Sequence, residues 1–250
     1  MAPILHSRLP QDMAAPRALP GTAPLDMAGW PVVDEAYAAQ MAERARLIAA
    51  RREDVHALLP AARPAAEELL ALVVAQLAAR PELGFAGDGS GLRCPDGRQV
   101  VPDPGAPLIT LGHLLQEDLC ILQKRGDSHV LTGAILCFPA SWTLAEKIGR
   151  PLRRIHDPVA SYDDNIARRV QRMFDGLRAG RPLWRSNLLR FADPALYQPR
   201  PEAHPRPPPD RGQAGYLRAE RQSLLRLPET GAVVFSIHTY VVATPDGAAP

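Results

Sequence analysis

The sequence predicts an α+β fold in which helices pack against an antiparallel sheet. Helical periodicity occurs between residues 34 and 79 and again between 144 and 177, and a β-branched apolar run lies between these regions. Two strand-like segments follow residue 215. This order of a strand, several helices and a closing hairpin suits a mixed domain whose sheet holds a ligand against the intervening helices.

The chain divides into an extended N-terminal arm (1–31), one main domain with a helical N-terminal extension (32–245) and a flexible tail (246–250). The arm is rich in Pro, Ala and Gly and suits a segment that wraps the domain or a partner. A first amphipathic helix is predicted from Asp34, as its N-cap, to His56. A second covers 64–79 and ends at Arg80-Pro81.

The middle of the chain contains a small hairpin, a strand and two helices. Pro-Asp-Gly at 95–97 predicts the turn of the hairpin, and the apolar run 129–138 predicts a buried strand that Pro139 ends. Helices are predicted over 144–155 and 163–177.

The C-terminal part predicts an extended connection followed by two paired strands. Prolines are concentrated within 202–215, which favours an extended chain. The final strands begin near Tyr216, turn at 227–231 and continue over 232–242, and we expect them to pair antiparallel.

Composition excludes several classes of protein. The formal charge of +2, from 29 basic and 27 acidic residues, disfavours a general nucleic-acid binder. Cys94, Cys120 and Cys137 are far apart, which indicates neither a disulfide framework nor a self-contained iron–sulfur or zinc site. Neither a signal-peptide pattern nor a run of roughly 20 apolar residues is present, so we expect a cytoplasmic protein that does not enter a membrane.

A series of short motifs between residues 81 and 233 carries a resemblance to a known family. The motifs are PELGF (81–85), QEDLC (116–120), FPASW (138–142), EKIG (146–149), IHDPV (155–159), RPLWRSN (181–187), LRAERQ (217–222), LP (227–228) and GAV (231–233). Together they resemble the haem-dependent oxidative N-demethylase alpha-subunit-like family, formerly a domain of unknown function.

The resemblance implies a PAS-like domain that binds haem b and acts as a monooxygenase. Oxygen and external electrons would hydroxylate the methyl group of an amine such as dimethylamine, and the product would collapse to the demethylated amine and formaldehyde. The chain shows neither a dinucleotide-binding loop nor iron–sulfur cysteine spacing. We therefore expect electrons from a separate NAD(P)H-dependent flavin and iron–sulfur reductase, in a hetero-oligomer or through a ferredoxin-type subunit.

His156 is the first candidate for the axial ligand of the haem iron. A neutral imidazole coordinates iron directly, and His156 ends a helical segment beside apolar residues, just before Pro158. From the residues alone, a purely structural role for His156 is about as common as a ligand role. The competing ligands are His113, His129 and His238.

Glu220 is the first candidate for a polar group that positions substrate or oxygen, with Tyr162 as a second. Arg221 could pair with a haem propionate or hold Glu220, although a strand-surface ion pair is equally expected. Gln222 and Tyr240 are further hydrogen-bonding candidates. Because side chains alternate along a strand, residues 220 and 221 point to opposite faces. All of these residues can therefore line one pocket only if the strand has a bulge or bend.

Trp184, Arg185 and His238 complete the predicted cofactor contacts. Trp184 is more often a core anchor than a cofactor contact, and Arg185, like Lys147, could form a structural ion pair. His238 stands where the family usually has arginine, which puts a propionate or substrate contact in doubt.

The sequence is also compatible with two other functions. PAS-like domains also serve as haem sensors or scaffolds, because a fold does not fix a function. Departures from the family pattern leave room for a structural subunit without cofactor; they lie at Ala140, Ala160, Leu188 and His238.

Overall fold

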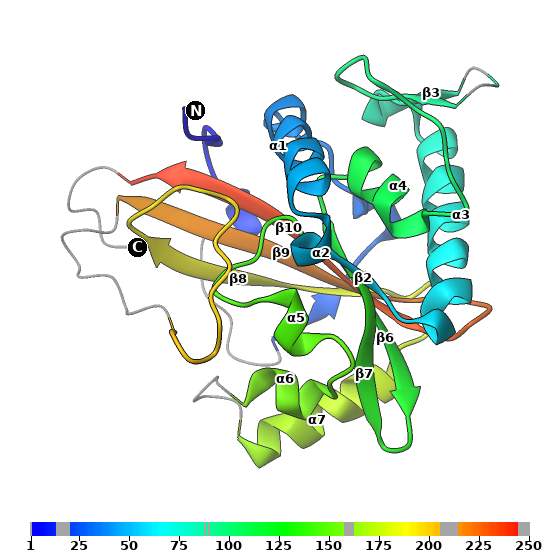
Figure 1. The fold of residues 1–250 in the computed structure, drawn as a ribbon, viewed down its shortest axis with the longest axis vertical. Coiled ribbons are helices and arrows are strands. Elements are labelled where there is room, and N and C mark those ends of the chain that lie inside the picture. Colours follow the sequence, from blue (N-terminus) through cyan, green and yellow to red (C-terminus); the bar gives the residue numbers. More distant parts are fainter. Residues whose placement is uncertain are drawn as a thin grey trace.

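The computed structural model describes residues 2–13, 21–87, 89, 91–157, 163–205 and 215–244. Its main feature is a seven-stranded antiparallel sheet with the strand order β1-β8-β9-β10-β6-β7-β2, with helices packed against it (Figure 1). The predicted α+β class is therefore confirmed. A second sheet of three short strands, in the order β3-β4-β5, projects from the domain beside α3.

The long strands of the main sheet come from the middle and the end of the chain. β9 (Tyr216–Arg226) and β10 (Val233–Ala243) pair in unbroken register, which confirms the closing hairpin. The strand predicted at 129–138 is also confirmed, as is the hairpin around 95–97. The remaining bounds are β1 (Ala23–Pro24), β2 (His56–Leu58), β3 (Ala86–Gly87), β4 (Leu92–Arg93), β5 (Gln99–Val100), β6 (Asp118–Arg125), β7 (Ser128–Ile135) and β8 (Leu183–Phe191).

The helices differ from prediction at three places, one of which is α4, a helix that was not predicted. The helices are α1 (Tyr37–Ala50), α2 (Arg52–Val55), α3 (Arg63–Ala79), α4 (Pro107–Leu114), α5 (Leu144–Lys147), α6 (Leu152–His156) and α7 (Asp164–Gly176). The single helix expected from 34 to 56 is wrong, because it begins at Tyr37, breaks at Arg51, and gives way to β2 at His56. None of the helices in the described ranges is long and apolar enough to cross a membrane.

The helix expected over 144–155 is divided into α5 and α6. Gly149 lies between them with φ 75°, a left-handed conformation that ends a helix, and Pro151 has no N–H to donate. The helix expected over 163–177 is confirmed as α7, and Asp163 caps it by accepting a hydrogen bond from Ile166 N at 2.8 Å.

The sheet has two differently covered faces (Figure 1). On one face, which we call the arm face, sheet residues such as Ala219 and Val234 pack with α1, α3, α4 and the N-terminal arm. On the other, which we call the α6 face, Leu224 and Val233 pack with residues of α5, α6 and α7. The α6 face receives all three helices from the single connection between β7 and β8.

The described part of the arm is packed against its own domain. β1 pairs with β8, and His6 N donates to Val241 O at 2.7 Å. Met13 is fully buried, and the indole N–H of the buried Trp30 donates to Ser236 Oγ at 2.8 Å. The arm therefore contributes to the core of the arm face.

Candidate functional site

Four polar side chains form a connected row on the α6 face, which we call the polar ladder: Arg185, Gln222, Glu220 and Arg218. Alternation along β9 directs its three members to the same side, and Arg185 of β8 lies opposite Gln222. Arg185 Nη1 donates to Gln222 Oε1 at 2.8 Å, and Gln222 Nε2 donates to Glu220 Oε2 at 2.9 Å. Arg218 Nε lies 3.7 Å from Glu220 Oε1. Glu220 is thus held from both sides.

The ladder is anchored at its buried end. Arg218 is 1% exposed, and its guanidinium donates to Leu196 O at 2.9 Å and to Phe138 O. Burial lowers the pKa of Arg185, although the charge of Glu220 opposes that effect. The Nε atoms of Arg185 and Arg218 are buried and have no hydrogen-bond partner among the described residues. The Arg185 Nε–H is therefore suited to a further acceptor, such as a carboxylate brought by a ligand.

His156 is the last residue of α6, and one hydrogen bond defines its tautomer. Its Nδ1 lies 2.8 Å from Leu152 O, and because a carbonyl only accepts, Nδ1 carries the proton. The neutral ring then has its lone pair on Nε2. Burial lowers the pKa of His156, the hydrogen bond to Leu152 opposes that shift, and the charges of Lys147 and Arg185 lower the pKa further. The imidazole is thus kept neutral near pH 7.

Lys147 fixes the position of α6 relative to α5. Its Nζ donates to Ile155 O at 2.7 Å and pairs with Glu202 Oε1 at 2.6 Å. Glu202 also accepts from Arg154 at 2.8 Å, so one carboxylate joins two cations around the helix that carries His156. Lys147 therefore forms a structural ion pair, as the sequence analysis considered.

The residues of the α6 face fit a haem. Haem binding requires an imidazole in the tautomer whose lone pair can face the iron, cations for the propionates and apolar surroundings. The face supplies the tautomer of His156, the buried Nε–H of Arg185, and the side chains of Leu152, Phe174 and Leu224 in one apolar cluster.

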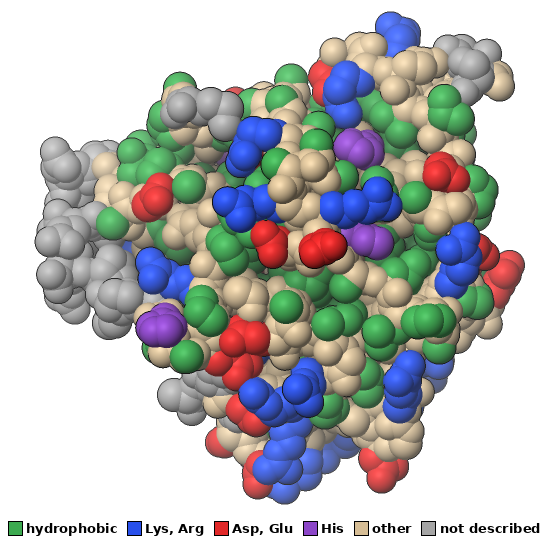
Figure 2. Space-filling model, in the orientation of Figure 1, with side chains coloured by type: hydrophobic (Ala, Val, Ile, Leu, Met, Phe, Trp, Pro, Cys, Tyr) green, Lys and Arg blue, Asp and Glu red, His purple; other side chains and the backbone are tan. Residues whose placement is uncertain are grey.

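The outer surface next to His156 is rich in arginine. Residues 150–181 contain eight arginines and four aspartates, a net +4 in a chain whose total is +2. Exposed basic side chains gather at the end of the molecule formed by α6 and α7 (Figure 2). Arg153 and Arg154 form ion pairs with Asp164 and Glu202, whereas the exposed Arg168, Arg169 and Arg172 have no ion pair with a described residue.

Three predicted site residues lie on the arm face instead. Register places Trp184, Arg221 and His238 on the side opposite Glu220, as alternation required. The Arg221 guanidinium stacks 4.7 Å from the centre of the Trp184 indole, and its Nη1 lies 3.9 Å from Asp12 Oδ2. Arg221 therefore does not hold Glu220. Arg218, which was not predicted, lies two residues before Glu220, so alternation puts it on the same face, while its position beside Glu220 depends on contacts with distant carbonyls.

The other candidates are dispersed. His113 lies in α4, on the side of the arm face, and burial lowers its pKa. His129 of β7 is bonded through Nδ1 to Gln171 Nε2 at 2.8 Å and packs 5.2 Å from the Phe174 ring, beside α7. Tyr162 and Ala160 lie outside the described residues.

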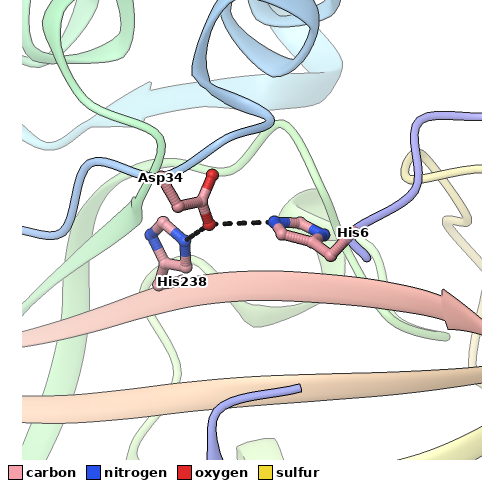
Figure 3. A group of neighbouring side chains, drawn as sticks. All are labelled: His6, Asp34 and His238. Atoms are coloured by element: carbon pink, nitrogen blue, oxygen red, sulfur yellow. Dashed lines mark hydrogen bonds and ion pairs between the residues drawn. The ribbon is translucent and has the colours of Figure 1, made fainter. Parts of the chain in front are cut away.

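A second cluster joins His6, Asp34 and His238 on the arm face (Figure 3). Asp34 Oδ2 lies 2.8 Å from His6 Nε2 and 2.9 Å from His238 Nε2. His238 Nδ1 lies 3.5 Å from Glu117 Oε1. Asp34, predicted as a helix N-cap, instead holds two histidines, and no local sequence signal links residues so far apart.

The electrostatics of this cluster favour opposite charges. Burial opposes ionisation of Asp34, but hydrogen bonds from His238, His6 and Gln116 outweigh it and hold the pKa of Asp34 far below its usual value. Burial also disfavours the charged form of His238, yet its contacts with Asp34 and Glu117 raise the pKa of His238 to about 9. The cluster therefore contains a carboxylate and an imidazolium near pH 7.

Comparison with known protein families identifies the family of this chain. The family model described as haem-dependent oxidative N-demethylase, alpha subunit-like, matches residues 21–246. The matched span includes His156 and the whole polar ladder, and begins after His6. Its description specifies haem dependence, and the term alpha subunit points to a multi-subunit enzyme. The chain belongs to the haem-dependent oxidative N-demethylase, alpha subunit-like family.

Proposed function

We propose that this protein is the haem-binding subunit of an oxidative N-demethylase and that its cofactor lies between the α6 face and α6. The observation that carries the proposal is the tautomer of His156, whose Nδ1–H is fixed by Leu152 O, so that Nε2 is the ring nitrogen with the lone pair that iron requires. When bound, haem b would supply the oxygen-activating chemistry that oxidises an N-methyl group, with dimethylamine as the first substrate to test.

The side chains of this chain would have separate roles. Arg185 would pair with a haem propionate through its buried Nε–H. Glu220, held by Gln222 and Arg218, would bind the amine nitrogen or hold a proton beside it. The packed apolar residues around α6 would keep bulk water away from these groups. Tyr162 stays a predicted contact, and Trp184, Arg221 and His238 do not belong to the proposed haem site.

The strand topology supports a PAS-like architecture for the main domain. The five long strands have the order β7-β6-β10-β9-β8, and α5, α6 and α7 all lie in one connection and cover one face. Such a sheet can hold a ligand against its crossover helices. We propose residues 32–245 as this domain, with the arm and the short tail as its additions.

Electrons would come from a separate protein. We propose an NAD(P)H-dependent flavin and iron–sulfur reductase, within a hetero-oligomer in the cytoplasm. The arginine-rich surface of α6 and α7 supports an acidic partner, because complementary charges steer association toward the helix that carries His156. Binding of that partner should accordingly weaken as salt concentration rises.

Absorption spectroscopy of protein expressed with haem supplied tests the ligand. Wild type is expected to show a Soret band, His156→Ala to lose it or shift it strongly, and the matched variant His129→Ala to keep it. A wild type that binds no haem refutes the proposal, and an unchanged His156→Ala spectrum moves the ligand to another histidine.

Amine oxidation tests the reaction itself. Glu220→Gln is close in size and removes only the charge, so haem content is expected to persist while formaldehyde release from dimethylamine falls by about 10²-fold or more. Stoichiometric haem without amine turnover in wild type, with an artificial reductant, would instead indicate a haem sensor or scaffold.

A further inference from the structure

The cluster of His6, Asp34 and His238 ties three distant segments to one carboxylate (Figure 3). His6 belongs to the arm, Asp34 precedes α1, and His238 lies in the middle of β10. Both histidines are buried, and both direct Nε2 at Asp34 Oδ2, at 2.8 and 2.9 Å. The other carboxylate oxygen of Asp34 accepts from Gln116 Nε2 at 2.8 Å and from Ala36 N at 3.0 Å.

The hydrogen bonds determine where the protons lie. Val241 N–H donates to His6 Nδ1 at 3.2 Å, so the proton of a neutral His6 is on Nε2 and is donated to Asp34. His238 has a carboxylate beside each ring nitrogen, Asp34 at 2.9 Å and Glu117 at 3.5 Å. Only the Asp34 contact is a hydrogen bond, since Nδ1 has no hydrogen-bond partner among the described residues, but the two carboxylates on either side of the ring together favour the imidazolium form of His238.

The same hydrogen bonds argue against a metal ion at this cluster. A metal would need the lone pair of His6 Nε2, and the ring would then carry its proton on Nδ1. The Val241 N–H already points at Nδ1, which makes that tautomer unfavourable. The cluster is better described as a proton site than as a metal site.

The cluster fastens the first described residues of the arm. His6 forms two backbone contacts with Val241, and Ser7 donates through N and Oγ to Glu35 Oε1 at 2.6 and 2.8 Å. Farther along, Met13 is fully buried in the core of the arm face. Between these contacts the arm is exposed or partly exposed, with Ile4, Leu5 and Leu9 only partly buried where they pack against the core. The His6 contacts are therefore the polar attachment of its first residues.

We propose that residues 2–13 form a pH-sensitive strap, which stays closed on the arm face while His238 is protonated and opens when His238 loses its proton. Loss of that proton leaves Asp34 and Glu117 buried without the cation between them, and repulsion between the carboxylates then disrupts the site that accepts the His6 proton. Opening would uncover Met13 and the Arg221–Trp184 pair, on the back of the strand hairpin that carries Glu220.

The charged and titratable groups around His238 come from every element packed against it. Asp34 before α1, Glu117 before β6 and Tyr240 on β10 contact its ring, His6 of the arm shares Asp34 with it, and Arg221 lies opposite it on β9. Charged groups one contact farther out are Asp12 beside Arg221, Glu35 beside Ser7 and Arg44 near Glu117. Tyr240 packs 4.7 Å from the His238 ring, and burial raises its pKa, which keeps it neutral in mildly alkaline solution. Asp34 and Glu117 are the two groups in contact with the His238 nitrogens.

Tryptic cleavage after the exposed Arg8 measures strap opening directly. The rate is followed from the released N-terminal peptide in the full chain between about pH 7 and pH 10, relative to an unstructured peptide of the same sequence. With the pKa of His238 at about 9, relative cleavage is expected to rise about tenfold by pH 10. A flat wild-type profile overturns the proposal.

Substitutions distinguish the titration of His238 from general alkaline loosening. His238→Arg keeps a positive charge at every pH and is expected to abolish the rise, while the matched exposed variant His204→Arg should keep it. Glu117→Gln removes one partner of the cation and is expected to move the rise to lower pH, and it serves as the decisive variant if His238→Arg does not fold. The strap mechanism is contradicted if the rise persists in folded His238→Arg or if the Glu117→Gln profile is not shifted. It is also contradicted if adding EDTA at about pH 7 speeds cleavage, because a bound metal ion would then hold the strap.

Discussion

Replacing Asp118 by asparagine is expected to destabilise the protein by about 3–5 kcal/mol. Asp118 Oδ1 lies 2.7 Å from Nη1 of Arg44, and both side chains are essentially inaccessible to solvent. The carboxylate also accepts from Cys137 N at 2.7 Å and from Phe138 N at 2.8 Å, which fixes the end of β7 against the start of β6. The substitution leaves Arg44 as a buried cation without its counter-ion.

The consequence for the candidate site follows from the same contacts. Phe138 O accepts from Arg218, and Arg218 lies beside Glu220. Loosening the Phe138 backbone should therefore reduce the ordering of the polar ladder as well as global stability. We expect Asp118→Asn to lower haem affinity even at temperatures where the variant remains folded.

Urea unfolding followed by circular dichroism measures the first effect, with a double-mutant cycle as the control. Arg44→Met in the Asp118→Asn background removes the unpaired cation, so the double variant is expected to be more stable than Asp118→Asn alone. A loss below about 1 kcal/mol for Asp118→Asn, or additive effects of the two substitutions, would refute the reasoning that an uncompensated buried charge dominates the cost.

Two further predictions concern packing and pH. Gly112→Ala is expected to cost about 1–3 kcal/mol in urea unfolding, because its Cβ would lie 2.8 and 2.9 Å from two isoleucine side chains; Gly176→Ala, with open space around it, should instead be neutral or stabilising. The raised pKa of His238 contributes about 3 kcal/mol that is fully present below about pH 6.5 and is lost as the pH rises through about 9. The difference in free energy of unfolding between wild type and His238→Arg should therefore change by that amount between pH 6 and pH 10. The buried thiols of Cys120 and Cys137, whose pKa values are also raised, cancel in this difference because both proteins contain them. A constant difference over this pH range would contradict the prediction.

Local pattern was sufficient to predict much of the fold. The helices α3 and α7 show a clear helical period, β7 and the closing hairpin show apolar, β-branched runs, and the chemistry of turns and caps sets their ends. β6 and β8 were missed as strands because their residues mix buried apolar and polar side chains, and tertiary pairing decides their conformation. The break between α5 and α6 was visible in principle, since Gly149 and Pro151 stand inside the expected helix.

The candidate site was only partly predictable because it depends on register. The sequence indicated His156, Arg185 and Glu220, and it showed that Arg221 must face away from Glu220. It could not show that Arg218 would take the place considered for Arg221, since that depends on Phe138 and Leu196 carbonyls from distant loops. The His6–Asp34 contact spans 28 positions without a periodic pattern, so only the folded arm brings the two together.

Alternation along β9 and β10 has a mechanistic consequence for both proposals. Glu220 lies opposite Thr239, whereas Arg221 lies opposite His238, so two neighbouring pairs in the same hairpin serve different faces. A movement of His238 when the strap opens would be transmitted to the α6 face through the backbone of the neighbouring Thr239, and not through contacts between side chains. The coupling is therefore expected to act on the orientation of Glu220 and Thr239, and not on the His156 ligand, which belongs to α6. Strap opening in alkaline solution should then change amine turnover while leaving the Soret band in place, and a Soret change that follows Arg8 cleavage would show that the two faces are coupled in another way.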